Sequence, residues 1–213
     1  MFSEMVPPVV ALPAGTKIVR IHRIDRAPIF FGPSAGTPPG NRFDAPSGEF
    51  RVLYAAQRLE GAFVETILRR PKDRILRPAF VEERAYSELR LERPLRLAKL
   101  HGEGLQAFGT DAGELGIDDH SLSRALAAAI HAAWSDLDGI AYRSRYNNGE
   151  ICHAVFDRAG ASSLVPIRTE RFDAGGETVG RLMALHRAAF DLSPPVPERL
   201  TRARRQSSGL SSE

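Results

Sequence analysis

Three stretches of this sequence carry side chains that together could bind a phosphorylated ligand and break a bond to its sugar. Arg42 lies in a glycine-rich loop, Glu65 in a stretch expected to be helical, and Ser144 directly after an expected strand. A guanidinium binds two phosphate oxygens at once. A carboxylate beside a sugar stabilises the positive charge that develops as a glycosidic bond breaks. Arg23, at the end of another expected strand, is a second candidate for binding phosphate.

Each of these residues also has an ordinary structural interpretation. Glu65 can be a solvated helix glutamate, and Ser144 can belong to a polar hairpin that turns at Asn147, Asn148 and Gly149. Only three of the 29 basic residues are lysines, so the abundance of arginine singles out none of the arginines. The residues taken one at a time therefore leave both interpretations open.

Hydrophobic periodicity predicts strands and helices that follow one another without a regular βαβ rhythm. Leu59, Phe63 and Ile67, for example, recur every four residues, which is typical of a helix. This mixture favours a single α+β domain, with a mixed sheet and flanking helices, over a doubly wound sheet. We expect strands at 17–23, 50–55, 95–100, 139–142 and 150–157, and helices at 58–70, 121–135 and 177–190.

The chain divides into one main domain and two flanking segments. Residues 1–16 are interrupted by prolines and are expected to be irregular, residues 17–192 form the domain, and residues 193–213 form a mobile basic tail. Residues 199–213 carry the whole net charge of +3, so the rest of the chain is neutral. We therefore expect no direct nucleic-acid binding. The long loop at 26–48, rich in Gly, Pro and Ser, is expected to be functional.

Cysteine usage and hydropathy favour a cytoplasmic protein without a membrane partner. Cys152 is the only cysteine, which excludes an intrachain disulfide, fits a reducing compartment and is expected to be a buried thiol. The N-terminus lacks the basic start of a signal peptide, and no apolar run is long enough to span a membrane. The spacing of the six histidines is not that of a zinc site, so we expect no metal.

The order and spacing of five short segments resemble the RES domain family, which is named for its Arg, Glu and Ser. The likeness extends over roughly residues 17–160. One departure is Asn41, which stands before Arg42 where the family often has glycine; it leaves the arginine in place and is expected to alter the loop that carries it. The matching segments are 21–24, 40–43, 52–55, 62–66 and 138–145.

This resemblance implies an NAD-degrading toxin whose fold is similar to that of ADP-ribosyltransferases. Family members are similar to NAD phosphorylases, in which inorganic phosphate attacks the nicotinamide ribose and releases nicotinamide. NAD and phosphate would then both be substrates, and no separate cofactor is expected. The resemblance also implies a helix-turn-helix antitoxin that blocks the active site, and family members often form homodimers.

Under this interpretation three residues are expected to be catalytic. Glu65 would stabilise the charge on the ribose, and Ser144 would orient Glu65 or the ribose through its hydroxyl. Arg23, together with Arg42, would bind the pyrophosphate or the incoming phosphate.

Two further residues are expected to bind the substrate. Tyr54 could stack on the nicotinamide or adenine ring, although a tyrosine packed in the core is an equally good interpretation. Arg143, beside Ser144, is expected to contact the substrate. The acceptor stays open: water would make the protein an NAD glycohydrolase, and a protein side chain would make it an ADP-ribosyltransferase. The alternative outside enzymology is a non-catalytic module that binds a nucleotide.

Overall fold

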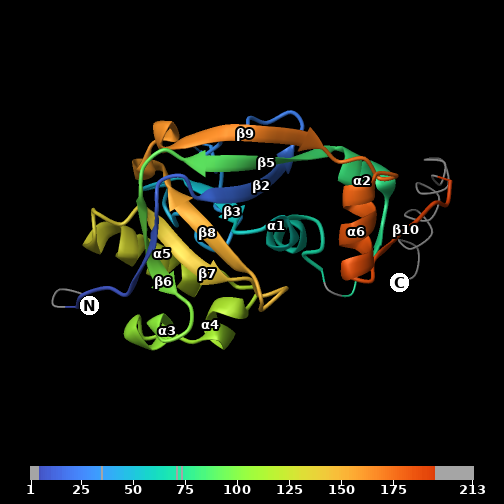
Figure 1. Ribbon diagram of the computed structural model, residues 1–213. Helices are drawn as coiled ribbons and strands as arrows, with labels where there is room; N and C mark the ends of the chain where they lie inside the picture. The colour runs from blue at the N-terminus through green and yellow to red at the C-terminus, as the bar shows by residue number, and fades with distance from the viewer. Residues whose placement is uncertain (1–4, 35, 71, 73, 195–213) are drawn as a thin grey trace, which may run out of the picture.

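The computed structural model describes residues 5–34, 36–70, 72 and 74–194 of the chain. In these residues the main element is an eight-stranded mixed sheet with the strand order β1-β6-β7-β8-β3-β2-β5-β9 (Figure 1). Only β6 and β7 run parallel, and the other neighbours in this sheet are antiparallel. The strands are β1 (Val9–Leu12), β2 (Lys17–Arg23), β3 (Val52–Ala56), β5 (Arg84–Leu91), β6 (Leu95–Leu100), β7 (Gly139–Arg143), β8 (Ile151–Phe156) and β9 (Leu164–Arg171).

Helices flank this sheet, so the expected α+β class is confirmed. A second, two-stranded sheet joins β4 (Ile75–Leu76) in parallel to β10 (Ala189–Phe190). None of the helices in the described ranges is long and apolar enough to cross a membrane. The helices are α1 (Leu59–Thr66), α2 (Pro78–Glu82), α3 (Gly104–Ala107), α4 (Ala112–Gly116), α5 (Ser121–Ala133) and α6 (Glu177–Leu185), with 3-10 turns at Asp157–Ala159 and Ala161–Ser163.

The large sheet is nearly divided between β2 and β3. In the described residues these strands share one register pair, Val19 with Ala56, whereas β2 and β5 pair along their whole length. Figure 1 shows β2, β5 and β9 above β6, β7 and β8. One apolar cluster joins strands of both halves, including Leu53, Leu89 and Leu97. The sheet is therefore curved, and its two halves pack against each other.

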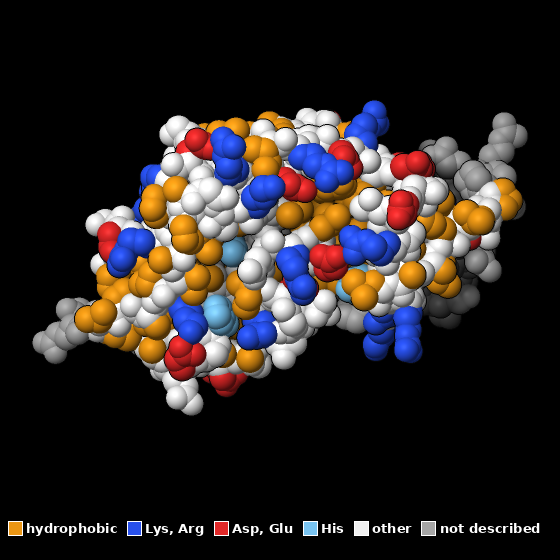
Figure 2. Space-filling view, viewed as in Figure 1, with side chains coloured by type: hydrophobic (Ala, Val, Ile, Leu, Met, Phe, Trp, Pro, Cys, Tyr) orange, Lys and Arg blue, Asp and Glu red, His pale blue; other side chains and the backbone are white. Residues whose placement is uncertain are grey.

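A second apolar cluster lies between the sheet and the helices α1, α5 and α6. Helix α5 contributes Ala127 and Ile130, both fully buried, and α1 contributes Phe63. Burial of these side chains is the main favourable contribution to the folded state. On the face shown in Figure 2, basic and acidic side chains are interspersed with hydrophobic ones.

The expectation that residues 1–16 are irregular is wrong for Val9–Leu12, whereas residues 5–8 and 13–16 lie in neither a helix nor a strand. Residues Val9–Leu12 form β1, which pairs antiparallel with β6 from Val9 with Ala98 to Leu12 with Leu95. The reason is that β7 pairs with only one edge of β6, and the apolar run between the prolines pairs with the other edge. The predicted basic tail, residues 193–213, lies outside the described residues except for Ser193 and Pro194.

The variant Gly139→Ala tests the packing of β7 against β8. A Cβ atom at this position would lie 2.3 Å from the Ala154 carbonyl oxygen and 2.9 Å from the Val155 Cα, so the backbone of β8 must move. We expect the free energy of unfolding to fall by about 1–3 kcal/mol in urea denaturation. Gly180→Ala in α6 is the control, because open space surrounds Gly180 and it should not destabilise the protein. Equal stability of both variants would contradict this packing.

Candidate active site

A cavity of about 220 Å³ opens where β2 and β3 separate. Three residues of each strand line it, Val19, Arg20 and Ile21 from β2 and Tyr54, Ala55 and Ala56 from β3. The other polar side chains around it come from four further parts of the chain. They are Asn41, Arg42, Glu65, Thr66, Arg69, His120, Tyr142, Arg145 and Tyr146.

Glu65 enters this cavity from the last turn of α1, and Ser144 holds its carboxylate. The Ser144 hydroxyl donates a hydrogen bond of 2.6 Å to Glu65 Oε1, a length typical of hydroxyl–carboxylate bonds. The same Oγ accepts hydrogen bonds of 3.1 Å from the backbone amides of Tyr146 and Asn147. Because two donors occupy the oxygen, its own proton points at Glu65. Ser144 is only 2% exposed, so this arrangement is fixed in the interior.

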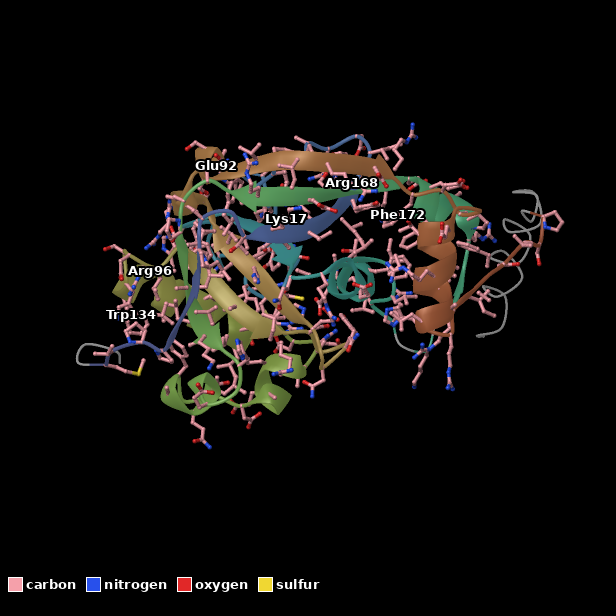
Figure 3. The ribbon with its side chains drawn as sticks, in the orientation of Figure 1. Lys17, Glu92, Arg96, Trp134, Arg168 and Phe172 are labelled. Atoms are coloured by element: carbon pink, nitrogen blue, oxygen red, sulfur yellow. The ribbon has the colours of Figure 1, made fainter. Side chains whose placement is uncertain are left out.

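Packing on both sides fixes the position of helix α1. Phe63, two residues before Glu65, is fully buried and makes an edge-to-face contact with Phe172 at 6.0 Å between ring centroids. Phe172 is labelled in Figure 3, where it lies near α6. On the other side, an added Cβ at Gly61 would lie 3.0 Å from Glu150 Oε2, so the helix lies close to β8. The buried Glu150 also accepts hydrogen bonds from Arg58, just before the helix.

The loop that carries Arg42 is organised by a buried carboxylate. Asp44 is fully buried, and its Oδ2 accepts hydrogen bonds from the backbone amides of Gly40 at 2.9 Å and Asn41 at 2.7 Å. From α5, Arg124 Nε donates to the Asn41 carbonyl oxygen at 3.0 Å. The loop therefore has a defined conformation although its sequence has no helical or strand periodicity.

Arg42 is a buried cation at the cavity wall. Its side chain is 9% exposed, and its guanidinium lies 5.2 Å from the ring centroid of Tyr142 and 5.6 Å from that of Phe43. No hydrogen bond or ion pair of this guanidinium is present among the described residues, although it borders a cavity. A buried charge is costly unless it is paired. An anionic ligand in this cavity would supply the missing partner.

Tyr54 uses its hydroxyl to hold the Arg42 loop. The hydroxyl donates to Asp44 Oδ1 at 2.9 Å and accepts from the Phe43 amide at 3.0 Å. Burial, together with the charge of Asp44, raises the pKa of Tyr54 well above its usual value, so the hydroxyl stays a donor. The ring borders the cavity, and its stacking on a ligand ring stays a prediction.

Arg23 is not brought to the cavity with Glu65. It lies at the exposed end of β2, where Nε is 3.2 Å from Asp25 and Nη1 is 3.7 Å from Glu83. Arg20, three residues earlier, lines the cavity instead and donates to the Phe30 carbonyl oxygen at 2.8 Å. Burial, with a smaller effect of Arg26, lowers the pKa of Arg20 to about 10, so this side chain stays charged at neutral pH.

Arg143 is also separate from the Glu65 cavity. Its exposed side chain donates to the Asn148 carbonyl oxygen across the hairpin. It borders a neighbouring cavity that is also lined by Ser144, Arg42 and Arg145. The structure thus brings Arg42, Tyr54 and Glu65 to one cavity, with Ser144 bonded to Glu65 behind it.

Sequence reasoning did not single out Arg145, although it stands beside Ser144. Its guanidinium donates to the Gly116 carbonyl oxygen at 2.7 Å, to Asp118 at 2.7 Å and to the Tyr146 hydroxyl at 2.8 Å. These bonds hold the loop after β7 against the end of α4. The repeated arginines around Ser144 were the signal for this role, but the pattern alone does not tell which arginine turns inward.

The cavity has a strongly cationic lining. Glu65 is the single carboxylate among its described lining residues, whereas Arg20, Arg42, Arg69 and Arg145 are cations. Burial, followed by Arg145 and Arg124, lowers the pKa of His120, so its imidazole is neutral at pH 7. The site therefore combines one oriented carboxylate with positive charge suited to a phosphorylated ligand.

The remaining candidate groups offer little chemistry. Cys152 is 1% exposed, and burial, followed by the charges of Glu65 and Glu150, raises the pKa of its thiol, so it is not a nucleophile at neutral pH. Within the described part of the chain, no group of His, Cys, Asp and Glu side chains could hold a metal ion.

Comparison with known families identifies this class of protein. The profile of the RES domain family matches residues 17–175, and the chain belongs to that family. A chain in the crystal structure of the M. tuberculosis MbcT–MbcA toxin–antitoxin complex is similar in fold, with a TM-score of 0.59 and 14% sequence identity. That similarity covers 83% of this chain and 90% of the other. A comparison with curated protein sequences finds no significant match.

The variant Tyr54→Phe tests how the Arg42 loop is held. It leaves the buried Asp44 and the Phe43 amide each without one partner, so we expect a loss of about 1–3 kcal/mol in the free energy of unfolding. Tyr146→Phe is the control. The Tyr146 hydroxyl accepts a hydrogen bond from Arg145, and the Arg145 guanidinium keeps its hydrogen bond to Asp118 in this variant. The loss in the free energy of unfolding should therefore be below about 1 kcal/mol. Chemical denaturation measures both, and a smaller loss for Tyr54→Phe would contradict the account.

Proposed function

We propose that this protein is a toxin-like enzyme that cleaves the nicotinamide–ribose bond of NAD and transfers the ADP-ribosyl group to inorganic phosphate. The observation that carries the proposal is the Glu65 carboxylate, held by Ser144 at 2.6 Å within an arginine-lined cavity. Membership of the RES domain family supports the same reaction class.

In the proposed reaction, the bond between the ribose C1′ and the nicotinamide nitrogen breaks first. Its electron pair leaves with nicotinamide, which becomes neutral, and positive charge develops on the ribose. Glu65 stabilises that charge at the ribose, and Ser144 keeps the carboxylate in place. A phosphate oxygen then bonds to C1′ and the phosphate releases one proton to water. The products are nicotinamide and an ADP-ribose that carries the phosphate on the same C1′.

The arginines of the site are suited to bind the phosphate groups of the two substrates. Arg42, which lacks an ion-pair partner among the described residues, is suited to the pyrophosphate of NAD. Arg69 lies just after the end of α1 and borders both the Glu65 cavity and an adjoining basic cavity with Arg70 and Lys72. The positive charge of this adjoining cavity favours an anionic acceptor such as phosphate over water.

The experiment that tests the function is product analysis by mass spectrometry. The purified full-length protein is incubated with NAD, with and without inorganic phosphate. We expect nicotinamide to be released from NAD. When phosphate is present, we expect ADP-ribose phosphate as the second product. ADP-ribose alone would identify a hydrolase, and a labelled protein would identify an ADP-ribosyltransferase. Unchanged NAD would contradict the proposed function altogether.

An antitoxin is the proposed protein partner. The similar fold in the M. tuberculosis structure is part of a toxin–antitoxin complex, which supports this part of the proposal. A partner that covers the mouth of the Glu65 cavity would prevent NAD from entering. The helix-turn-helix type of this partner and the homodimer stay predictions.

The variant Glu65→Gln tests the catalytic carboxylate. It keeps the size of the side chain but removes the charge, so nicotinamide release should slow by about 10²–10³-fold. Glu60→Gln is the matched control, because Glu60 lies on the same helix but pairs with Arg181 outside the cavity. Its rate should stay within about twofold of the wild type, since surface substitutions change little. A Glu65→Gln enzyme with full turnover would remove Glu65 from the mechanism.

The variant pair Arg42→Ala and Arg23→Ala tests which arginine binds the pyrophosphate. Loss of charged hydrogen bonds worth about 1.5–3 kcal/mol should raise the KM for NAD by about 10- to 100-fold in Arg42→Ala. Arg23→Ala should leave the KM unchanged, because Arg23 pairs with Asp25 and Glu83 away from the cavity. Steady-state kinetics provide the KM, and melting temperatures exclude unfolding. The opposite order of effects would assign the role to Arg23.

A further inference from the structure

A second cavity, of about 580 Å³, lies beside the Glu65 cavity at the ends of β6 and β7. Helices α3 and α4 form its far side, with Leu105, Ala112 and Leu115 among the lining residues. Arg42 and Tyr142 line this cavity and the Glu65 cavity alike. The two cavities are therefore neighbours, and a buried cation stands at their boundary.

The size of the Glu65 cavity makes a second compartment necessary for a dinucleotide. Its 220 Å³ falls below the roughly 300–1,000 Å³ of sites that hold ligands of drug size. By that measure it is smaller than a site for a whole dinucleotide. With the second cavity included, the space available reaches the range that such a ligand needs.

The lining of the second cavity suits a purine nucleoside. Its walls are mainly apolar, as in most sites that bind flat organic rings. Arg143 and Arg145 also line it, and their guanidinium groups donate to the Asn148 carbonyl oxygen and to Asp118. His101 adds a further aromatic ring, and burial, followed by Lys99 and Arg143, lowers the pKa of His101, so that ring is neutral at pH 7. The alternative direction from Glu65 leads to the basic cavity lined by Arg69, Arg70 and Lys72, whose charges suit phosphate rather than a base.

We propose that the second cavity binds the adenosine half of NAD, while Arg42 binds the pyrophosphate between the two halves. This inference rests on the proposed function and adds a specificity site to it. Adenosine in the apolar cavity then supplies binding energy remote from the ribose that reacts at Glu65. Selection for an adenine nucleotide is located between α3, α4 and the ends of β6 and β7.

Binding of AMP to cavity-filling variants tests this inference without turnover. Ala112→Trp and Ile117→Trp each place a large ring in the second cavity, and both positions are exposed enough to tolerate it. Ala132→Trp is the control, because Ala132 is an exposed helical alanine away from both cavities. By calorimetry on the full chain, AMP should bind the wild type and the control alike. Both cavity variants should bind it at least tenfold more weakly.

Nicotinamide mononucleotide provides the complementary ligand. It should occupy the Glu65 cavity, so its affinity should be the same in all four proteins. The inference would be overturned if AMP did not bind the wild type detectably, or if Ala112→Trp and Ile117→Trp bound AMP as tightly as the wild type. It would also be overturned if both variants lost the same affinity for AMP and for nicotinamide mononucleotide. The proposed function fails separately, if the wild-type protein releases no nicotinamide from NAD.

Discussion

The hydrogen bond between Ser144 and Glu65 is the constraint around which the site is arranged. It joins the last turn of α1 to the loop after β7, elements separated by 79 residues in the chain. The serine can donate to the carboxylate because the amides of Tyr146 and Asn147 occupy its oxygen. A carboxylate oriented in this way needs little reorganisation when positive charge develops beside it.

The sheet supplies the space in which that carboxylate acts. Strands β2 and β3 share one register pair and then separate, so the cavity lies between two strands rather than on a surface. The buried Asp44 and the Tyr54 hydroxyl fold the 40–44 loop over one side and bring Arg42 to the wall. The separation of the strands and the closed loop together place the Glu65 carboxylate and the Arg42 guanidinium around one cavity.

The sequence was sufficient to predict the α+β class, most strands around the site and the candidates Glu65, Ser144 and Arg42, because these depend on local pattern and family motif. It did not allow β5 to be predicted, since the buried Ser87 interrupts its apolar pattern. That serine is satisfied by His22 at 2.9 Å and Thr169 at 2.8 Å, contacts between distant segments that no local pattern records. Arg23 was named as a candidate and Arg20 was not, because local pattern does not record which arginine of β2 faces the cavity either. The separation of β2 from β3 decides which residues of β2 reach the cavity.

We propose that Glu65 and Arg42 together enclose the reacting half of a dinucleotide. A crystal structure of the Glu65→Gln protein soaked with NAD tests it most directly, because slow turnover should preserve the substrate. We expect the nicotinamide ribose to lie against residue 65 and the pyrophosphate to lie within hydrogen-bond distance of the Arg42 guanidinium. NAD bound elsewhere on the protein, with the cavity between β2 and β3 empty, would contradict it.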